Sequence, residues 1–98
     1  MCKTGEPPVE KKAQCTAWHE KRLKTRNDDA KRYNVPLIIS EFGACTGSEA
    51  CVQEINTVVD LCDKYMLSWA YWEFKKFKDI TTSAGSTSEG FYENDGTL

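Results

Sequence analysis

Metal-binding residues are scarce in this sequence. It has one histidine, His19, and its five cysteines form no Cys-x-x-Cys pair and no Cys/His cluster. Because a zinc site needs clustered cysteine and histidine ligands, we expect no metal, and no cofactor is indicated. No apolar run approaches the length of a membrane span, which predicts the absence of a transmembrane segment.

An excess of charge of one sign is also missing. The formal net charge is −2 over 98 residues, with 29% of them charged and 40% hydrophobic. This balance is typical of a globular protein and gives no electrostatic attraction to nucleic acid or to anionic membranes. The stretch from Met1 to Pro8 contains no apolar segment, so no signal peptide is visible.

The cysteines are odd in number and leave the redox state open. They are Cys2, Cys15, Cys45, Cys51 and Cys62. Cys45 and Cys51 flank a predicted strand-to-helix turn, and we expect their Cα atoms to lie within the roughly 4.4–6.8 Å that a disulfide requires. Free thiols in a reducing compartment are the alternative.

Hydrophobic periodicity predicts the order helix, strand, helix, strand. The first helix runs from about residue 10 to Tyr33, with a weak point at residues 27–29 where it would break or re-cap. The second runs from Ser48 to Tyr65, with Ser48 or Thr46 as its cap. Its apolar stripe, which we expect to face the sheet, consists of Val52, Ile55, Val59, Cys62 and Met66.

The predicted strands cover residues 36–42 and 67–74. The first is a continuous apolar run that starts near Val35 and ends at a carboxylate, Glu41, which favours a strand buried on both faces. Two strands separated by one helix form a βαβ unit, so they should be adjacent and parallel. Trp18, Tyr33 and Trp69 are expected to pack in the core or against the sheet.

Two motifs carry a family resemblance. Pro36-Leu37-Ile38-Ile39-Ser40-Glu41-Phe42-Gly43, followed by Ser68-Trp69-Ala70-Tyr71-Trp72-Glu73-Phe74-Lys75, resembles the last two strands of a glycoside hydrolase family 5 barrel. The similarity is greatest to endoglycoceramidase-like and cellulase-like members, and residues 79–92 resemble the loop after their final strand. The resemblance implies an α/β fold, part of a (β/α)8 barrel. Because a complete barrel needs about 250 residues, residues 1–98 are expected to be the C-terminal portion of one such domain.

The resemblance also implies a catalytic role for Glu41. Retaining glycosidases use two carboxyl groups about 5–5.5 Å apart, and the family's nucleophile at the end of strand seven maps onto Glu41. Its acid/base is a glutamate that follows an asparagine, and this sequence has no Asn-Glu dipeptide, so the chain alone should be inert. Trp72 maps onto the tryptophan under the sugar, whereas Glu73 should point away from that face by strand alternation. Lys75, Lys76 and Lys78 could reach over the cleft or lie in solvent.

Two functions remain open at this level. The first is a fragment of a retaining hydrolase of O-glycosidic bonds, with a glycolipid or a β-glucan as its carbohydrate substrate. The second is a non-catalytic remnant or a carbohydrate-binding or interaction module. Family members are often secreted or lysosomal, which gives the only indication of compartment, and the sequence indicates no oligomeric state.

Overall fold

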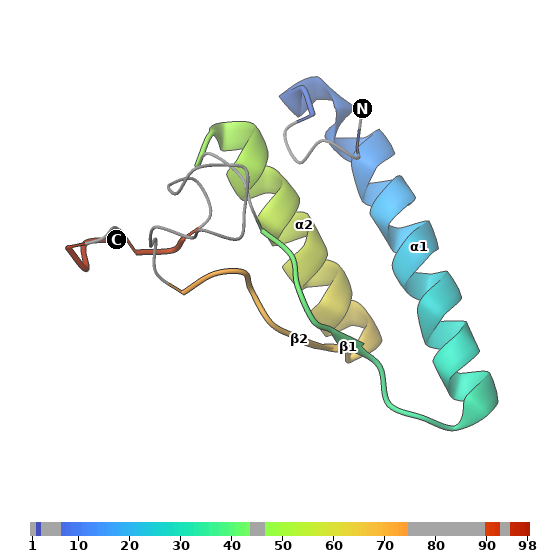
Figure 1. Cartoon of the computed structure of the whole chain (residues 1–98). Helices are drawn as coiled ribbons and strands as arrows, with labels where there is room; N and C mark the ends of the chain where they lie inside the picture. Colours follow the sequence, from blue (N-terminus) through green and yellow to red (C-terminus); the bar gives the residue numbers. More distant parts are fainter. Residues whose placement is uncertain (1, 3–6, 44–46, 75–89, 93–94) are drawn as a thin grey trace, which may run out of the picture.

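The fold consists of two long helices and a pair of very short strands (Figure 1). The computed structural model describes residues 2, 7–43, 47–74, 90–92 and 95–98. Within these, the order is a 3-10 helix η1 (Val9–Lys11), α1 (Lys12–Tyr33), β1 (Ile38–Ile39), α2 (Glu49–Tyr65) and β2 (Ser68–Trp69). The two α-helices lie side by side, and the strands run along one side of α2 (Figure 1).

The strand pair confirms the predicted topology. β1 and β2 are neighbours and parallel, with Ile38 opposite Ser68 and Ile39 opposite Trp69. α2 connects them, so the three elements form the expected βαβ unit. The regular ladder is shorter than residues 36–42 and 67–74. It resumes further along as one isolated bridge between Gly43 and Trp72.

α2 begins and ends where the sequence predicts. Ser48 is the N-cap, and its hydroxyl oxygen accepts a hydrogen bond from the backbone N–H of Cys51 at 3.1 Å. The helix ends at Met66, whose left-handed backbone lets its N–H bond back to Asp63. Thr46, the other predicted cap, which has the capping-box spacing to Glu49, lies outside the described residues, as do Cys45, Lys75, Lys76 and Lys78.

The predicted weak point in α1 is wrong. The helix is continuous through residues 27–29, and the acidic side chains there form ion pairs with basic residues of the same helix. Asp28 pairs with Lys24 at 2.6 Å, and Asp29 pairs with both Arg26 and Arg32. These are the i,i+3 and i,i+4 spacings that support a helix. α1 ends at Asn34 in the left-handed conformation, two residues before Pro36.

Burial differs from the sequence prediction in several places. The described apolar core comprises Cys15, Ala30, Cys51, Leu61, Cys62 and Leu67. Of the predicted α2 stripe, Cys62 is buried, whereas Val52 is exposed and Met66 is 93% exposed. Met66 leaves the stripe because it is the left-handed cap residue rather than part of the helix.

Three aromatic and aliphatic predictions also require correction. Tyr33 is exposed rather than packed on the sheet, and Trp69 is 41% exposed rather than a core residue. Ile38 is 59% exposed, so the first strand is not buried on both faces. For Ile38 and Trp69 the reason is that the sheet has only two strands among the described residues, so their side chains lack the neighbours that a larger sheet would supply.

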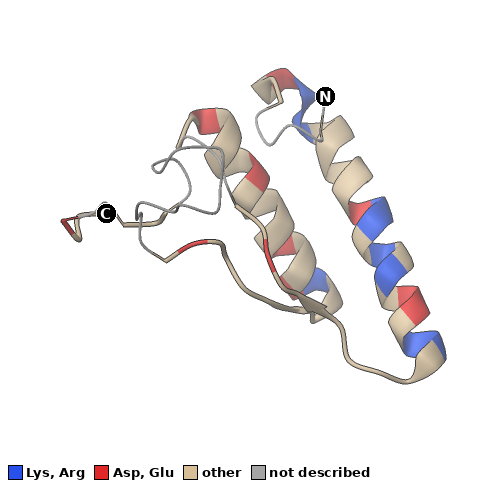
Figure 2. Cartoon of the chain, in the orientation of Figure 1, with Lys and Arg blue, Asp and Glu red and all other residues tan. Residues whose placement is uncertain are grey.

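Polar contacts also join the two helices. His19 of α1 contacts Glu54 of α2 through its Nε2 at 2.6 Å, and the Glu54 side chain is 8% exposed. Nearby, Glu20 accepts hydrogen bonds from Lys64 at 2.6 Å and from the Tyr65 hydroxyl at 2.7 Å. Figure 2 shows basic residues concentrated on α1 and acidic residues on α2, so the helices are complementary in charge.

A disulfide braces the N-terminal part of the chain. Cys2 is bonded to Cys15 near the start of α1, a pairing that the sequence did not indicate. Cys51 is disulfide-bonded as well, and the predicted separation between it and Cys45 stays a prediction because Cys45 is not described. Cys62 is a free, buried thiol. No helix in the described part of the chain is long and apolar enough to cross a membrane.

Candidate active site at the ends of the strands

Glu41 and Trp72 lie at the same end of the strand pair. Both follow their strands, at the carboxyl-terminal side, and the strands are parallel. Two contacts hold these ends together: Gly43 forms a parallel bridge with Trp72, and the N–H of Trp72 donates to the carbonyl oxygen of Phe42 at 2.8 Å. The segment that contains Glu41 is therefore fixed to the segment that contains Trp72 by the backbone.

The first strand carries one extra residue next to Glu41. Three residues separate Ile39 from Gly43, whereas only two separate their partners Trp69 and Trp72. The hydrogen bonds agree, because the carbonyls of Ile39 and Phe42 accept from the N–H groups of Ala70 and Trp72. This is a β-bulge, a device that bends a strand and changes the direction of a side chain.

The bulge places Glu41 on the open face of the strands. The ring of Phe42 packs edge-on against Trp69 at 5.4 Å and against Tyr71 at 5.6 Å, so these three rings share one face. Because successive residues of an extended chain point to opposite faces, Glu41 and Trp72 belong to the other one. Glu41 is exposed, and Trp72 is 38% exposed.

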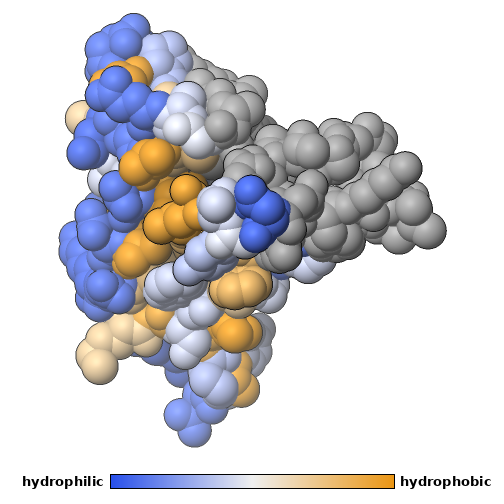
Figure 3. All heavy atoms as spheres, turned by 90° about the vertical axis from the view of Figure 1, so that its left-hand side faces the viewer, coloured by the Kyte–Doolittle hydropathy of each residue, from blue (hydrophilic) through white to orange (hydrophobic). Residues whose placement is uncertain are grey.

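The two faces of the strand pair differ in exposure. On the face that carries Ile39, Leu67, Trp69 and Tyr71, Trp69 is exposed and the other three are buried or partly buried. The opposite face carries Ile38, Ser40, Ser68 and Ala70, all exposed, in addition to Glu41 and Trp72. Figure 3 shows that hydrophobic residues also reach the surface in a band on one side of the molecule, bordered by hydrophilic residues.

The chain returns to this end of the strands near its C-terminus. The N–H groups of Phe91 and Tyr92 donate to the carbonyls of Glu73 and Phe74 at 2.9 and 3.0 Å. The Phe91 ring packs on Tyr71 at 4.1 Å, and the Tyr92 ring packs on Phe74 at 5.0 Å. Two further aromatic rings therefore pack against residues that follow the second strand.

Gly43 is required by the close approach of the strands. Its φ is +129°, a conformation that favours glycine. A Cβ atom there would overlap the Trp72 carbonyl oxygen and would lie 2.8 Å from the Tyr71 ring. The Glu-Phe-Gly motif is thus explained locally: the glycine lets the backbone after Glu41 touch the backbone at Trp72.

The described residues contain no group of three or more His, Cys, Asp or Glu side chains that could hold a metal ion. Glu73 is half-buried and bonded to Phe91 through its carbonyl. The catalytic role of Glu41, the sugar-binding role of Trp72 and the outward direction of Glu73 stay predictions.

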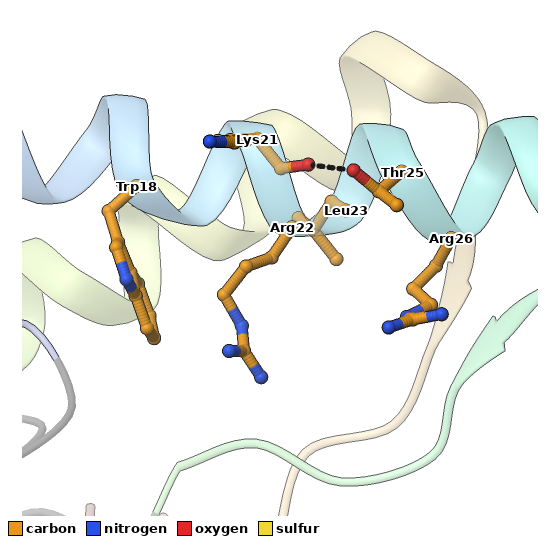
Figure 4. A pocket seen from close by; sticks show the side chains of 6 residues that line it. All are labelled: Trp18, Lys21, Arg22, Leu23, Thr25 and Arg26. Carbon is orange, nitrogen blue, oxygen red and sulfur yellow. Dashed lines mark hydrogen bonds between the residues drawn. The ribbon is translucent and has the colours of Figure 1, made fainter.

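Sequence reasoning missed one feature, a hollow on α1. It is lined by Trp18, Lys21, Arg22, Leu23, Thr25 and Arg26 and measures about 440 Å³ (Figure 4). The signal was available in the sequence, because Trp18, Arg22 and Arg26 are spaced by four and so share one face of a helix.

The chain has parallel strands joined by a helix, with a carboxylate and an indole at the carboxyl ends of the strands. This is the arrangement of α/β barrel proteins, whose active sites lie at the carboxyl ends of their strands. The chain matches the family model of cellulase, glycosyl hydrolase family 5, over residues 3–78, and it belongs to that family. Among curated proteins and solved structures, none matches it. The family implies a (β/α)8 barrel, and the βαβ unit corresponds to part of one.

Proposed function

We propose that this chain supplies the nucleophile and a sugar platform to a retaining glycoside hydrolase, with Glu41 and Trp72 in these two roles. The observation that carries the proposal is the pairing of strand ends, which brings a bulged carboxylate segment beside an aromatic one on an open face. Helices cover the outside of a (β/α)8 barrel, so the uncovered face corresponds to its interior. Barrel active sites are built at the carboxyl-terminal end of that interior.

Glu41 suits the chemistry of the first step. Its carboxylate attacks the anomeric carbon, the glycosidic C–O bond breaks, and the leaving oxygen takes a proton from a second carboxylic acid. Water then attacks the glycosyl ester, that second group removes the proton of the water, and Glu41 is released.

The acid/base is not provided by this chain. The sequence lacks the Asn-Glu dipeptide that carries it in the family. A carboxyl pair of about 5–5.5 Å is needed for retention, so the 98 residues by themselves should be inert. Activity belongs to a protein that joins these strands to the remaining part of a barrel.

Trp72 suits the binding of a sugar ring. The apolar C–H face of a pyranose packs on an indole, whose N–H stays free to donate a hydrogen bond. The 38% exposed fraction of Trp72 leaves surface for such a contact. The substrate class is an O-glycoside, either a β-glucan or a glycolipid, and the resemblance of residues 79–92 to endoglycoceramidase-like enzymes favours the glycolipid.

A non-catalytic role is the second candidate. The exposure of Ile38 and Val35, at 59% and 53%, gives this chain apolar surface that a binding or interaction module could use. The two functions differ in one respect: only the enzyme requires Glu41 as a nucleophile.

Chemical rescue of a nucleophile variant separates these functions. The natural sequence extended upstream would be assayed on an aryl β-glucoside and a glucosylated lipid, beside the 98-residue chain. We expect Glu41→Ala to lower the turnover of the extended protein on the order of 10⁴-fold. Azide should then restore turnover of the aryl glycoside by attacking from the face that Glu41 vacates, and it should yield a glycosyl azide of inverted configuration.

The matched control is Glu49→Gln, which removes an exposed carboxylate at the start of α2. It should keep wild-type turnover. Hydrolysis by the short chain, or an unrescued loss in Glu41→Ala with native circular dichroism, would contradict the assignment of Glu41. Inactivity of the extended wild type on both substrates, with soluble β-glucan retained on an affinity gel, would favour the binding module.

A further inference from the structure

The hollow on α1, lined by Trp18, Lys21, Arg22, Leu23, Thr25 and Arg26, combines one indole with three cations. Among the residues that the structure describes, its lining contains no carboxylate. Trp18, Arg22 and Arg26 point to the same side of the helix, away from Lys21 (Figure 4). We refer to it as the Trp18 hollow. It plays no part in the proposed glycosidase chemistry, since it lies on α1 rather than at the strand ends.

Arg22 is held in position by the tryptophan. The centre of its guanidinium group lies 4.7 Å from the centroid of the Trp18 ring, a cation–π contact. A guanidinium stacked on an aromatic face keeps its N–H groups directed outward in the plane of the fork. Trp18 is itself fixed by an edge contact with His19 at 4.8 Å, and His19 is tied to Glu54 of α2. The donors of Arg22 are therefore preorganised.

Arg26 lies one helical turn further along the same face. Residues four apart on a helix have Cβ atoms about 5–6 Å apart, which allows two arginine side chains to reach one ligand. Arg26 uses Nη1 for Asp29 at 3.1 Å, which leaves the other N–H groups of its fork to a ligand. Two guanidinium forks on one face match the oxygens of a tetrahedral oxyanion, which accepts several charge-assisted hydrogen bonds.

We propose that the Trp18 hollow binds a phosphate or sulfate group. Charge complementarity selects the ligand, because cations line the hollow and Asp29, the acid that pairs with Arg26, is also shared with Arg32. The volume of about 440 Å³ exceeds that of a free ion and leaves room for a sugar ring that carries the anion. Free anions and sugar esters share this chemistry, and the test distinguishes them.

The experiment is a titration of the 98-residue chain followed by nitrogen–proton correlation spectra. The probes are inorganic phosphate, inorganic sulfate, glucose 6-phosphate and glucose 6-sulfate, with uncharged glucose and sodium chloride as references. We expect saturable shifts of the Trp18 indole N–H and the Arg22 Nε–H, with dissociation constants on the order of 1 mM. Tighter binding of the sugar esters than of the free ions identifies an esterified sugar as the ligand. Equal binding identifies the anion alone.

Two variants decide whether the stacked fork is responsible. Arg22→Lys keeps the charge but loses the fork and the stacking, and it should weaken binding about tenfold. Lys31→Gln removes an exposed charge elsewhere on α1 and should leave the affinity unchanged. Absence of saturation, wild-type affinity in Arg22→Lys, or an equal loss in Lys31→Gln would overturn the proposal. Glycosidase activity does not enter the measurement.

Discussion

The backbone N–H of Trp72 donates to the carbonyl oxygen of Phe42 at 2.8 Å, one residue after Glu41. This bond fixes the spacing between the carboxylate segment and the indole segment. It exists because the first strand carries an extra residue there and because Gly43 allows the two backbones to touch. The local geometry of the candidate site is thus determined mainly by the backbone.

Substitution of Gly43 by alanine should destabilise the strand ends. A Cβ atom at φ +129° is strained and would overlap the Trp72 carbonyl. We expect a loss of about 1–3 kcal/mol in the free energy of unfolding from the backbone strain, and a further loss from the overlap. Urea unfolding followed by fluorescence measures it.

The matched control is Gly47→Ala. Gly47 also has a positive φ, +80°, but a Cβ there meets no atom within 4 Å. The difference between the two variants isolates the overlap with Trp72. Equal losses in both would show that the approach of the strands contributes nothing.

Acidification should weaken the contact between α1 and α2 at Glu20. Hydrogen bonds from Lys64, then from Tyr65, hold the pKa of Glu20 below its ordinary value of 4.5. A carboxyl group with a lowered pKa in the folded state contributes stability that is present above its unfolded pKa and is lost as the pH falls through the folded one. The same pairing raises the pKa of Lys64, whose contribution is lost only at strongly alkaline pH.

In the variant Glu20→Gln, stability should fall less between pH 7 and pH 2 than it does in the wild type. Thermal unfolding between pH 7 and pH 2 provides the measurement, and Glu10→Gln, at an exposed residue of η1, provides the control. We expect a small effect because the pair is at the surface and is screened by salt. If Glu20→Gln lost as much stability at acidic pH as the wild type, Glu20 would not be responsible for that loss.

The sequence predicted the topology well because its signals are local. The Ser48 cap, the stop at Tyr65 and the apolar run before Glu41 each follow from short motifs, and together they require parallel strands. Burial could not be predicted in the same way. Ile38 and Trp69 are hydrophobic but exposed, because their neighbours would belong to a larger sheet than the described two strands.

The candidate site was only partly predictable. Motif similarity indicated Glu41 and Trp72, but the bulge that turns Glu41 to the open face depends on the register of two strands. The helix through residues 27–29 and the His19–Glu54 contact depend on side-chain pairs, one of them 35 residues apart. Periodicity carries no information on such pairs.

Cys62 should be unreactive in the folded protein. It is a free thiol with no exposed surface, and burial raises its pKa, which keeps it protonated. We expect iodoacetamide at pH 8 to leave Cys62 unmodified without denaturant and to modify it in urea, as read by peptide mass spectrometry. The disulfide-bonded Cys15 is the control, since it should be modified only after reduction. Rapid labelling of Cys62 in the native chain would contradict its burial.

The effects of substituting His19 and Glu54 on the free energy of unfolding should depend on each other. Glu54 is buried, its Oε2 contacts His19, and its Oε1 has no hydrogen-bond partner among the residues that the structure describes. Replacing His19 by leucine leaves a buried carboxylate without its counterpart, and we expect a loss of about 3 kcal/mol.

The double variant His19→Leu/Glu54→Leu should be more stable than His19→Leu alone, because two apolar side chains can pack where an unpaired carboxylate cannot. Urea unfolding of the wild type, both single variants and the double variant closes the cycle. Additive losses would mean that the two side chains contribute independently. A positive coupling would show that this contact helps to join α1 to the βαβ unit that carries Glu41 and Trp72.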